Sequence, residues 1–196
     1  MNPFAGQGTD RSFYLPRLDR RYYQGHAVVH WTLPVAQRGT GWLNAAFHAR
    51  FREIMLHAAA REKLVCPIYC LMPDHLHLVW MGLHPASDQR RGMKFLREHL
   101  GPSLRPHRFQ HQAYDHVLRE SERRRGAFQT VCFYIRDNPR RAGLVAQPED
   151  WAFAGAIIPG YPVMDLADEK FWTRFWKLYA EWLATPNMVA ADVSRL

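Results

Sequence analysis

Two apolar segments separated by only two residues constrain the fold of this chain more than any other feature. Residues 64–72 (LVCPIYCLM) and 75–82 (HLHLVWMG) are rich in β-branched, aromatic and other apolar side chains, and Pro73-Asp74 lies between them. Runs of this kind are typical of buried strands, and so short a break allows consecutive strands to pair. We therefore expect two neighbouring, paired strands here.

The rest of the pattern predicts an α+β fold. Further strands are expected at 25–33 and 111–118, and amphipathic helices at 39–63, 87–101 and 121–144. Ser87 or Asp88 is a candidate cap for the second helix, and Pro139 places the end of the third nearby. The order β-α-β-β-α-β-α predicts a ferredoxin-like, RRM-like antiparallel four-stranded sheet with two helices on one face, together with the additional helix 121–144.

The chain divides into three parts. Residues 1–21 read as a leader without the apolar core of a signal peptide, 22–146 as the main domain, and 147–196 as a C-terminal helical extension. Within the extension, a helix at 168–183 carries a broad aromatic stripe, which predicts packing on the main domain. Because no apolar run approaches the length of about 18 residues that a membrane helix needs, we expect no membrane span.

Charge and cysteine content narrow the function further. Three cysteines in 196 residues are too few for a disulfide scaffold and favour a reducing, cytoplasmic compartment. Residues 90–141 hold thirteen Lys or Arg and five carboxylates, so this stretch alone carries the whole net charge of +8. Twelve of the thirteen are arginine, which suits bidentate phosphate contacts, so the segment predicts a nucleic-acid partner.

The apolar strand 75–82 contains two histidines that need an explanation. In a strand, residues i and i+2 point to the same side, so His75 and His77 project together while Leu76 and Leu78 face the other way. Two imidazoles at this spacing can share one divalent metal. The helix 121–144 adds Tyr134 and Asn138 four residues apart, hence on one face, where the amide oxygen suits Mg²⁺ or Mn²⁺ and the phenol can act as a nucleophile.

Three blocks together carry a resemblance to a known family. MPDHLHLV (72–79), YDHVLR (114–119) and YIRDNPRRAGLV (134–145), in this order, resemble the signature blocks of the REP-associated tyrosine transposases, which belong to the single-tyrosine HUH superfamily. The resemblance spans roughly residues 22–158. It implies a transposase that cleaves and joins single-stranded, hairpin-forming DNA through a 5′-phosphotyrosine intermediate, with no small-molecule substrate, as a nucleoid-associated monomer or homodimer.

The resemblance also implies individual roles. Tyr134 would be the nucleophile; His75, His77 and Asn138 would hold Mg²⁺ or Mn²⁺; and Asp74, where the family often has Asn, could orient an imidazole. Basic side chains of the two later helices would neutralise phosphates of the DNA. The candidates for DNA binding are Arg90, Arg91, Lys94, Arg97, Arg123, Arg124, Arg125, Arg140 and Arg141.

Two other classes of protein compete with this interpretation. A non-catalytic, RRM-like module for single-stranded nucleic acid would have the same fold, but it predicts aromatic residues where 75–82 has histidine. A structural zinc site would use Cys66, Cys70, His75 and His77. The two cysteines share strand parity yet lie about 13 Å apart along an extended strand, too far for one ion without a bend.

Overall fold

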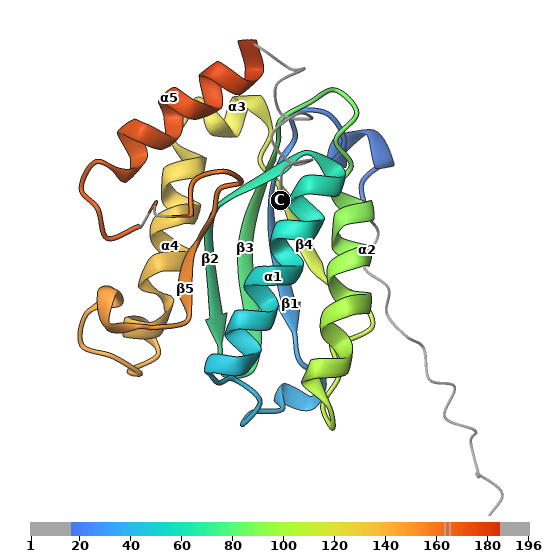
Figure 1. Cartoon of the computed structure of the whole chain (residues 1–196), viewed down its shortest axis with the longest axis vertical. Coiled ribbons are helices and arrows are strands. Elements are labelled where there is room, and N and C mark those ends of the chain that lie inside the picture. Colours follow the sequence, from blue (N-terminus) through green and yellow to red (C-terminus); the bar gives the residue numbers. More distant parts are fainter. Residues whose placement is uncertain (1–16, 163, 165, 185–196) are drawn as a thin grey trace, which may run out of the picture.

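A five-stranded antiparallel sheet forms the centre of the protein (Figure 1). The computed structural model describes residues 17–162, 164 and 166–184. The strands lie in the order β4-β1-β3-β2-β5. They are β1 (Val28–Pro34), β2 (Leu64–Met72), β3 (His75–Gly82), β4 (Tyr114–Val117) and β5 (Ala154–Ile157). The expected β2-β3 pairing is confirmed, and both strands have inner positions in the sheet, where their apolar side chains are covered on both faces.

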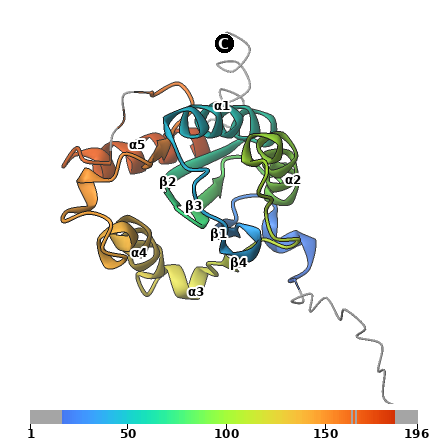
Figure 2. The same ribbon diagram turned by 90° about the horizontal axis from the view of Figure 1, so that it is seen from below.

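Helices cover both faces of this sheet. Figure 2 shows α1 and α2 on one side and α3 and α4 on the other, with α5 beside α4. The helices are α1 (Ala45–Glu62), α2 (Gln89–Leu100), α3 (Glu120–Arg123), α4 (Ala127–Arg141) and α5 (Phe171–Ala184). Short 3-10 turns lie at η1 (Arg20–Tyr23), η2 (Ala36–Arg38), η3 (Gly101–Leu104) and η4 (Pro148–Asp150).

The face under α1 and α2 is a closed apolar core. Trp31, Phe51, Leu78 and Trp80 are fully buried there. The indole N–H of Trp31 donates to the side-chain oxygen of Gln89, whose amide nitrogen donates in turn to the carbonyls of Ala27 and Trp80. This buried amide is therefore paired at both its oxygen and its nitrogen, which avoids the cost of leaving them unsatisfied.

The opposite face is only partly covered. Helix α4 packs against β2 and β3, and α5 adds Phe171, Phe175 and Tyr179 to the same core. The edge strand β4 and its neighbour β1 stay more open on this side, where the side chain of Tyr114 is 46% exposed. Alternation along β1, β3 and β4 directs every second side chain toward this half-open surface.

The predicted α+β, ferredoxin-like class is confirmed, with three differences in detail. Strand β5 is a fifth strand that pairs with β2 in a segment expected to be helical. The helix expected at 121–144 is two helices, because Gly126 adopts a left-handed φ of 81° between them. The strand expected at 111–118 spans only Tyr114–Val117. The leader up to residue 16 and the end from 185 lie outside the described residues.

Candidate active site

The two histidines of β3 point toward the half-open face. His77 lies opposite Thr32 of β1 in the antiparallel register, and His30 lies two residues earlier on β1 with the same parity. The three side chains therefore meet on one surface. Together with Tyr114, Tyr134 and Asn138 they line an open cleft of about 450 Å³.

The imidazoles of this surface form a connected chain. The Nε2 atoms of His75 and His77 are 3.0 Å apart. On its other side, Nδ1 of His77 lies 3.1 Å from Nε2 of His30 and 3.0 Å from the hydroxyl oxygen of Thr32. Each ring of the pair is thus held by contacts at Nδ1 while its Nε2 faces the partner ring.

Asp74 fixes the orientation of His75. Its carboxylate oxygen Oδ1 lies 2.5 Å from Nδ1 of His75, and Oδ2 lies 3.1 Å from Nε of Arg38. A carboxylate in this position sets the tautomer and the direction of an imidazole and makes its other nitrogen a better ligand. Asp74 therefore lies where the sequence analysis expected it to act.

Burial keeps the inner histidines neutral. The pKa of His77 is lowered to about 3, mainly because burial disfavours the charged form, with smaller contributions from His30 and His75. Burial likewise lowers the pKa of His30 to about 4, with His116 as a second cause. A neutral imidazole is the form that binds metal ions.

Helix α4 brings the predicted nucleophile to the same cleft. Tyr134, Asn138 and Arg141 lie at i, i+4 and i+7, hence on one face of the helix. The Tyr134 ring lies edge-on to His77 with 5.6 Å between centroids, and its side chain is 40% exposed. The guanidinium carbon of Arg141 lies 5.2 Å from the centroid of the same ring. The phenol is therefore positioned next to the His pair and remains open to a substrate.

The residues of the cleft fit a divalent ion. Adjacent ligands of an octahedral ion with bonds near 2.1 Å are about 3 Å apart, and the two Nε2 atoms are separated by 3.0 Å. The side-chain nitrogen of Asn138 is buried without a hydrogen-bond partner among the described residues, so the amide is free to turn its oxygen to an ion. Within residues 17–184 as described, no cluster of three or more His, Cys, Asp or Glu has metal-binding geometry, so a site here depends on the amide.

The nine basic side chains expected to bind DNA do not form one surface. Arg90, Arg91, Lys94 and Arg97 belong to α2, on the closed side of the sheet. Arg91 pairs with Glu62 and Lys94 with Glu98, while Arg97 donates to backbone carbonyls. The other five lie on or beside α3 and α4, on the side of the cleft: Arg123, Arg124, Arg125, Arg140 and Arg141.

His30, Thr32, Arg38 and Tyr114 line the cleft although the sequence analysis did not select them. His30 carries a signal of its own, since it interrupts an apolar strand just as His77 does. The sequence alone could not place His30 beside His77. Alternation along β1 does not say which of its side chains share a face with those of β3 until the register of the two strands is known. Tyr114 opens the YDHVLR block, but unlike Tyr134 it has no amide four residues on, and Arg38 carries no local pattern that would have selected it.

The cysteines cannot complete a zinc site with the His pair. The pairing of β2 with β3 shifts register between Val65 and Ile68. Because of this irregularity, the side chains of Cys66 and Cys70 point to opposite faces of the sheet. Cys66 packs in the core under α1 and α2, whereas Cys70 packs in the opposite core. Burial raises the pKa of the Cys70 thiol to about 12, so it stays protonated.

Comparison with known proteins supports the fold. No family model matches the chain, and no curated protein matches it in sequence. Among solved structures, a REP-associated tyrosine transposase bound to a REP hairpin is similar, with a TM-score of 0.60 and 19% sequence identity over 71% of this chain and 82% of that one. At this identity the likeness shows a shared fold. None of the described helices is long and apolar enough to span a membrane.

Proposed function

We propose that this protein is a DNA transposase-like enzyme that cleaves and rejoins single-stranded DNA at hairpin-forming, REP-like sequences. The observation that carries the proposal is the position of Tyr134, whose ring lies 5.6 Å from that of His77 across a cleft open to solvent. A nucleophile, a pair of imidazoles and the Asn138 amide converge there from α4 and β3. This combination is the constellation that metal-assisted phosphoryl transfer requires.

The reaction follows from these groups. The oxygen of Tyr134 attacks phosphorus and the bond to the 3′ oxygen breaks, while the phenol proton passes in net to that departing oxygen. The products are a free 3′ hydroxyl and a 5′-phosphotyrosine. A 3′ hydroxyl of the same or another strand then attacks that phosphorus and releases Tyr134. Mg²⁺ or Mn²⁺, held by His75, His77 and Asn138, would polarise the phosphodiester and stabilise the charge on its oxygens. Because the covalent link conserves the phosphodiester, no ATP is needed.

Neighbouring residues prepare the cleft for this chemistry. Asp74 and Arg38 hold the His75 ring, and Thr32 and His30 hold the His77 ring. Arg141, stacked near the Tyr134 ring, provides a positive charge where a phosphate would arrive. These contacts fix the groups before the substrate binds, which limits the cost of ordering them during the reaction.

The DNA substrate is proposed from charge and fold together. The net charge of +8 and the arginines beside α4 suit a polyanion. The protein with the similar fold was solved bound to a REP hairpin, so a hairpin with single-stranded flanks is the first substrate to test. A protein of this kind would act on the nucleoid in the cytoplasm. The competing proposal is an RRM-like module that binds such strands without cleaving them.

Detection of a covalent protein–DNA adduct tests the proposal. The wild type, incubated with hairpin DNA and Mg²⁺ or Mn²⁺, should form an adduct that survives denaturation and maps to Tyr134. Tyr134→Phe should form none and should still bind DNA, because it removes one oxygen from a half-exposed ring. Tyr114→Phe, which alters the other tyrosine of the cleft, is the matched control and should retain the adduct. Binding without any adduct in the wild type would favour the module.

A further inference from the structure

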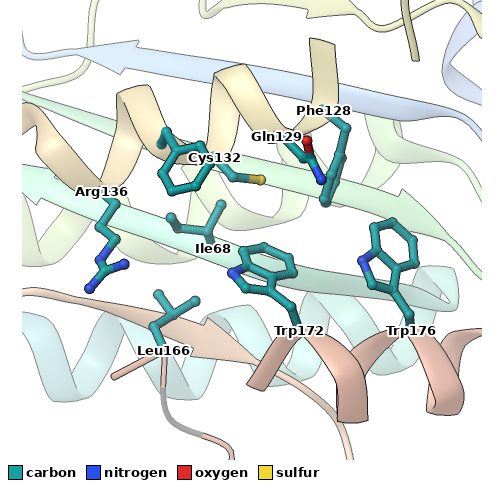
Figure 3. A pocket seen from close by; sticks show the side chains of 9 residues that line it. Ile68, Phe128, Gln129, Cys132, Arg136, Leu166, Trp172 and Trp176 are labelled. Carbon is teal, nitrogen blue, oxygen red and sulfur yellow. The ribbon is translucent and has the colours of Figure 1, made fainter. Parts of the chain in front are cut away.

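We propose that the cavity between α4 and α5 is a binding site for one unpaired nucleobase of the DNA strand that crosses Tyr134. Figure 3 shows this cavity, with Phe128 and Gln129 on the side of α4, Trp172 and Trp176 on the side of α5, and Ile68 of β2 at its base. The inference rests on the proposed function, because it needs a single strand at Tyr134.

The size of the cavity suits one aromatic ring system. Its volume is about 160 Å³, and an apolar cavity of roughly 150 Å³ is large enough to bind benzene. A single base therefore fits, whereas a stack of two does not. Such a ligand must be unpaired, because a base that enters a protein cavity has left its partner.

The chemistry of the walls matches a base better than an aliphatic group. The rings of Trp172 and Trp176 lie edge-on to Phe128, with centroids 5.7 and 5.0 Å away. Base stacking on aromatic side chains is a general mode of single-strand recognition. The Gln129 amide, at an exposed position of α4, offers both a donor and an acceptor at the wall of the cavity.

The cavity and the candidate active site each share lining residues with an intermediate cleft on α4. Phe133 and Arg136 line the cavity and also a neighbouring cleft of about 560 Å³, and Tyr134 lines that cleft as well as the cleft of the His pair. The rise along the axis of α4 from Gln129 to Tyr134 is about 8 Å, and the two positions lie roughly 140° apart around the helix. A strand with its phosphate at Tyr134 thus reaches the cavity within a few nucleotides.

One arginine that is unpaired among the described residues, together with two exposed aromatic side chains, favours a nucleic acid over an apolar protein segment as the occupant. Arg136 lies at one end of the cavity in Figure 3 and is paired with Glu149. The connecting cleft is also lined by Asp137 and Glu149, whose carboxylates pair with Arg140 and Arg136. Arg141 lines the same cleft and forms no ion pair within the described part of the chain. The exposed aromatic side chains Phe133 (63%) and Trp176 (42%) lie on this same path. Alternating aromatic and cationic side chains along a groove are typical of single-strand tracks.

The test identifies the flanking nucleotide whose base is bound and the side chain that binds it. Hairpin oligodeoxynucleotides with single-stranded flanks are prepared so that one flanking nucleotide at a time lacks its base, and dissociation constants are measured by fluorescence anisotropy. For the wild type, one such position should weaken binding about 5- to 100-fold. In Trp176→Leu, affinity for the intact oligonucleotide should fall by a similar factor, and removing that base should have no further effect.

Two other variants keep the test decisive. Trp182→Leu changes a tryptophan of the same helix that does not line the cavity and should bind as the wild type does. Gln129→Ala, at an exposed helix position, should fold normally and weaken binding only when the base is present. Equal losses for every missing base in both the wild type and Trp176→Leu would overturn the proposal and leave an apolar protein segment as the occupant.

The adduct assay separates this proposal from the proposed function. Suppose that the adduct forms but removal of a base weakens binding equally in the wild type and in Trp176→Leu. This result would overturn the base site and leave the proposed cleavage intact. If instead one base matters only when Trp176 is present and no adduct forms, the base site is retained and the proposed cleavage is overturned. Failure of the wild type to bind any of the oligonucleotides would overturn both.

Discussion

The two faces of the sheet are built by the same strands, but only the face under α4 combines an apolar core with an open, polar cleft. Under α1 and α2, large apolar side chains are fully buried, and the polar groups of Gln89 and Asp88 are hydrogen-bonded. Under α4, three histidines, a half-exposed tyrosine and the Asn138 amide, whose nitrogen has no partner among the described residues, surround an open cleft. The difference indicates that the face under α1 and α2 serves stability alone, whereas the open part of the other face tolerates less favourable contacts in order to bind and react.

The largest expected effect is on stability, and it distinguishes the closed core under α1 from the exposed side of α4. Phe51→Ala removes a fully buried ring beneath α1 and should lower the free energy of unfolding by about 3–5 kcal/mol. Phe133→Ala, the matched change at a ring that is 63% exposed on α4, should cost at most about 0.5 kcal/mol. Urea denaturation of both variants measures this difference, and similar losses would contradict it.

The next largest effect is on DNA binding, and it distinguishes the arginines of α4 from those of α2. Arg140→Gln with Arg141→Gln should weaken binding of single-stranded DNA and reduce its salt slope by about 0.7 for each phosphate that is no longer neutralised. Arg90→Gln with Arg91→Gln removes the same charge from α2 on the closed side and should leave the slope unchanged. Binding titrations at several salt concentrations measure both slopes. A larger change from the α2 pair would assign the DNA to the other face.

A smaller effect concerns pH and the cap of α2. Burial alone would raise the pKa of Asp88, but hydrogen bonds from Gln24, Arg20 and the first N–H groups of α2 lower it overall, below 3.8. The charged form therefore stabilises the fold above that pH, and this contribution is lost as the pH falls through the lower, folded-state pKa. Asp88→Asn keeps a capping oxygen but removes the charge that pairs with Arg20, so it should cost up to about 1 kcal/mol at pH 7. The difference from wild type should shrink as the pH falls below 3.8. Denaturation curves across this range test the sign, and a constant difference would contradict it.

Local pattern was sufficient to predict the main elements and the shared face of His75 and His77. The alternation in 75–82 predicted that His75 and His77 share one face of a strand. The spacing of Tyr134 and Asn138 predicted that these two share one face of a helix. That these two faces meet depends on α4 crossing the sheet, a tertiary contact that no local pattern encodes. Long periodic segments were predictable because each buries a continuous stripe of apolar side chains.

The errors in the sequence analysis also have physical causes. Strand β5 is four residues of small and apolar type (AGAI), too short and too weakly β-branched to stand out, and it forms because the edge of β2 is available. The expected common face of Cys66 and Cys70 failed because a local irregularity in β2 breaks the period of two. Neither feature can be seen without the pairing of the strands.

Adjacent residues of β3 provide the most direct test, because His77 faces the cleft and Leu78 faces the closed core. Adduct formation and urea unfolding are measured for His77→Ala and Leu78→Ala. We predict that His77→Ala abolishes the adduct with a smaller loss of stability, whereas Leu78→Ala loses about 2–5 kcal/mol of stability and its folded fraction still forms the adduct. Undiminished adduct formation by His77→Ala at saturating Mg²⁺ or Mn²⁺ would contradict the account.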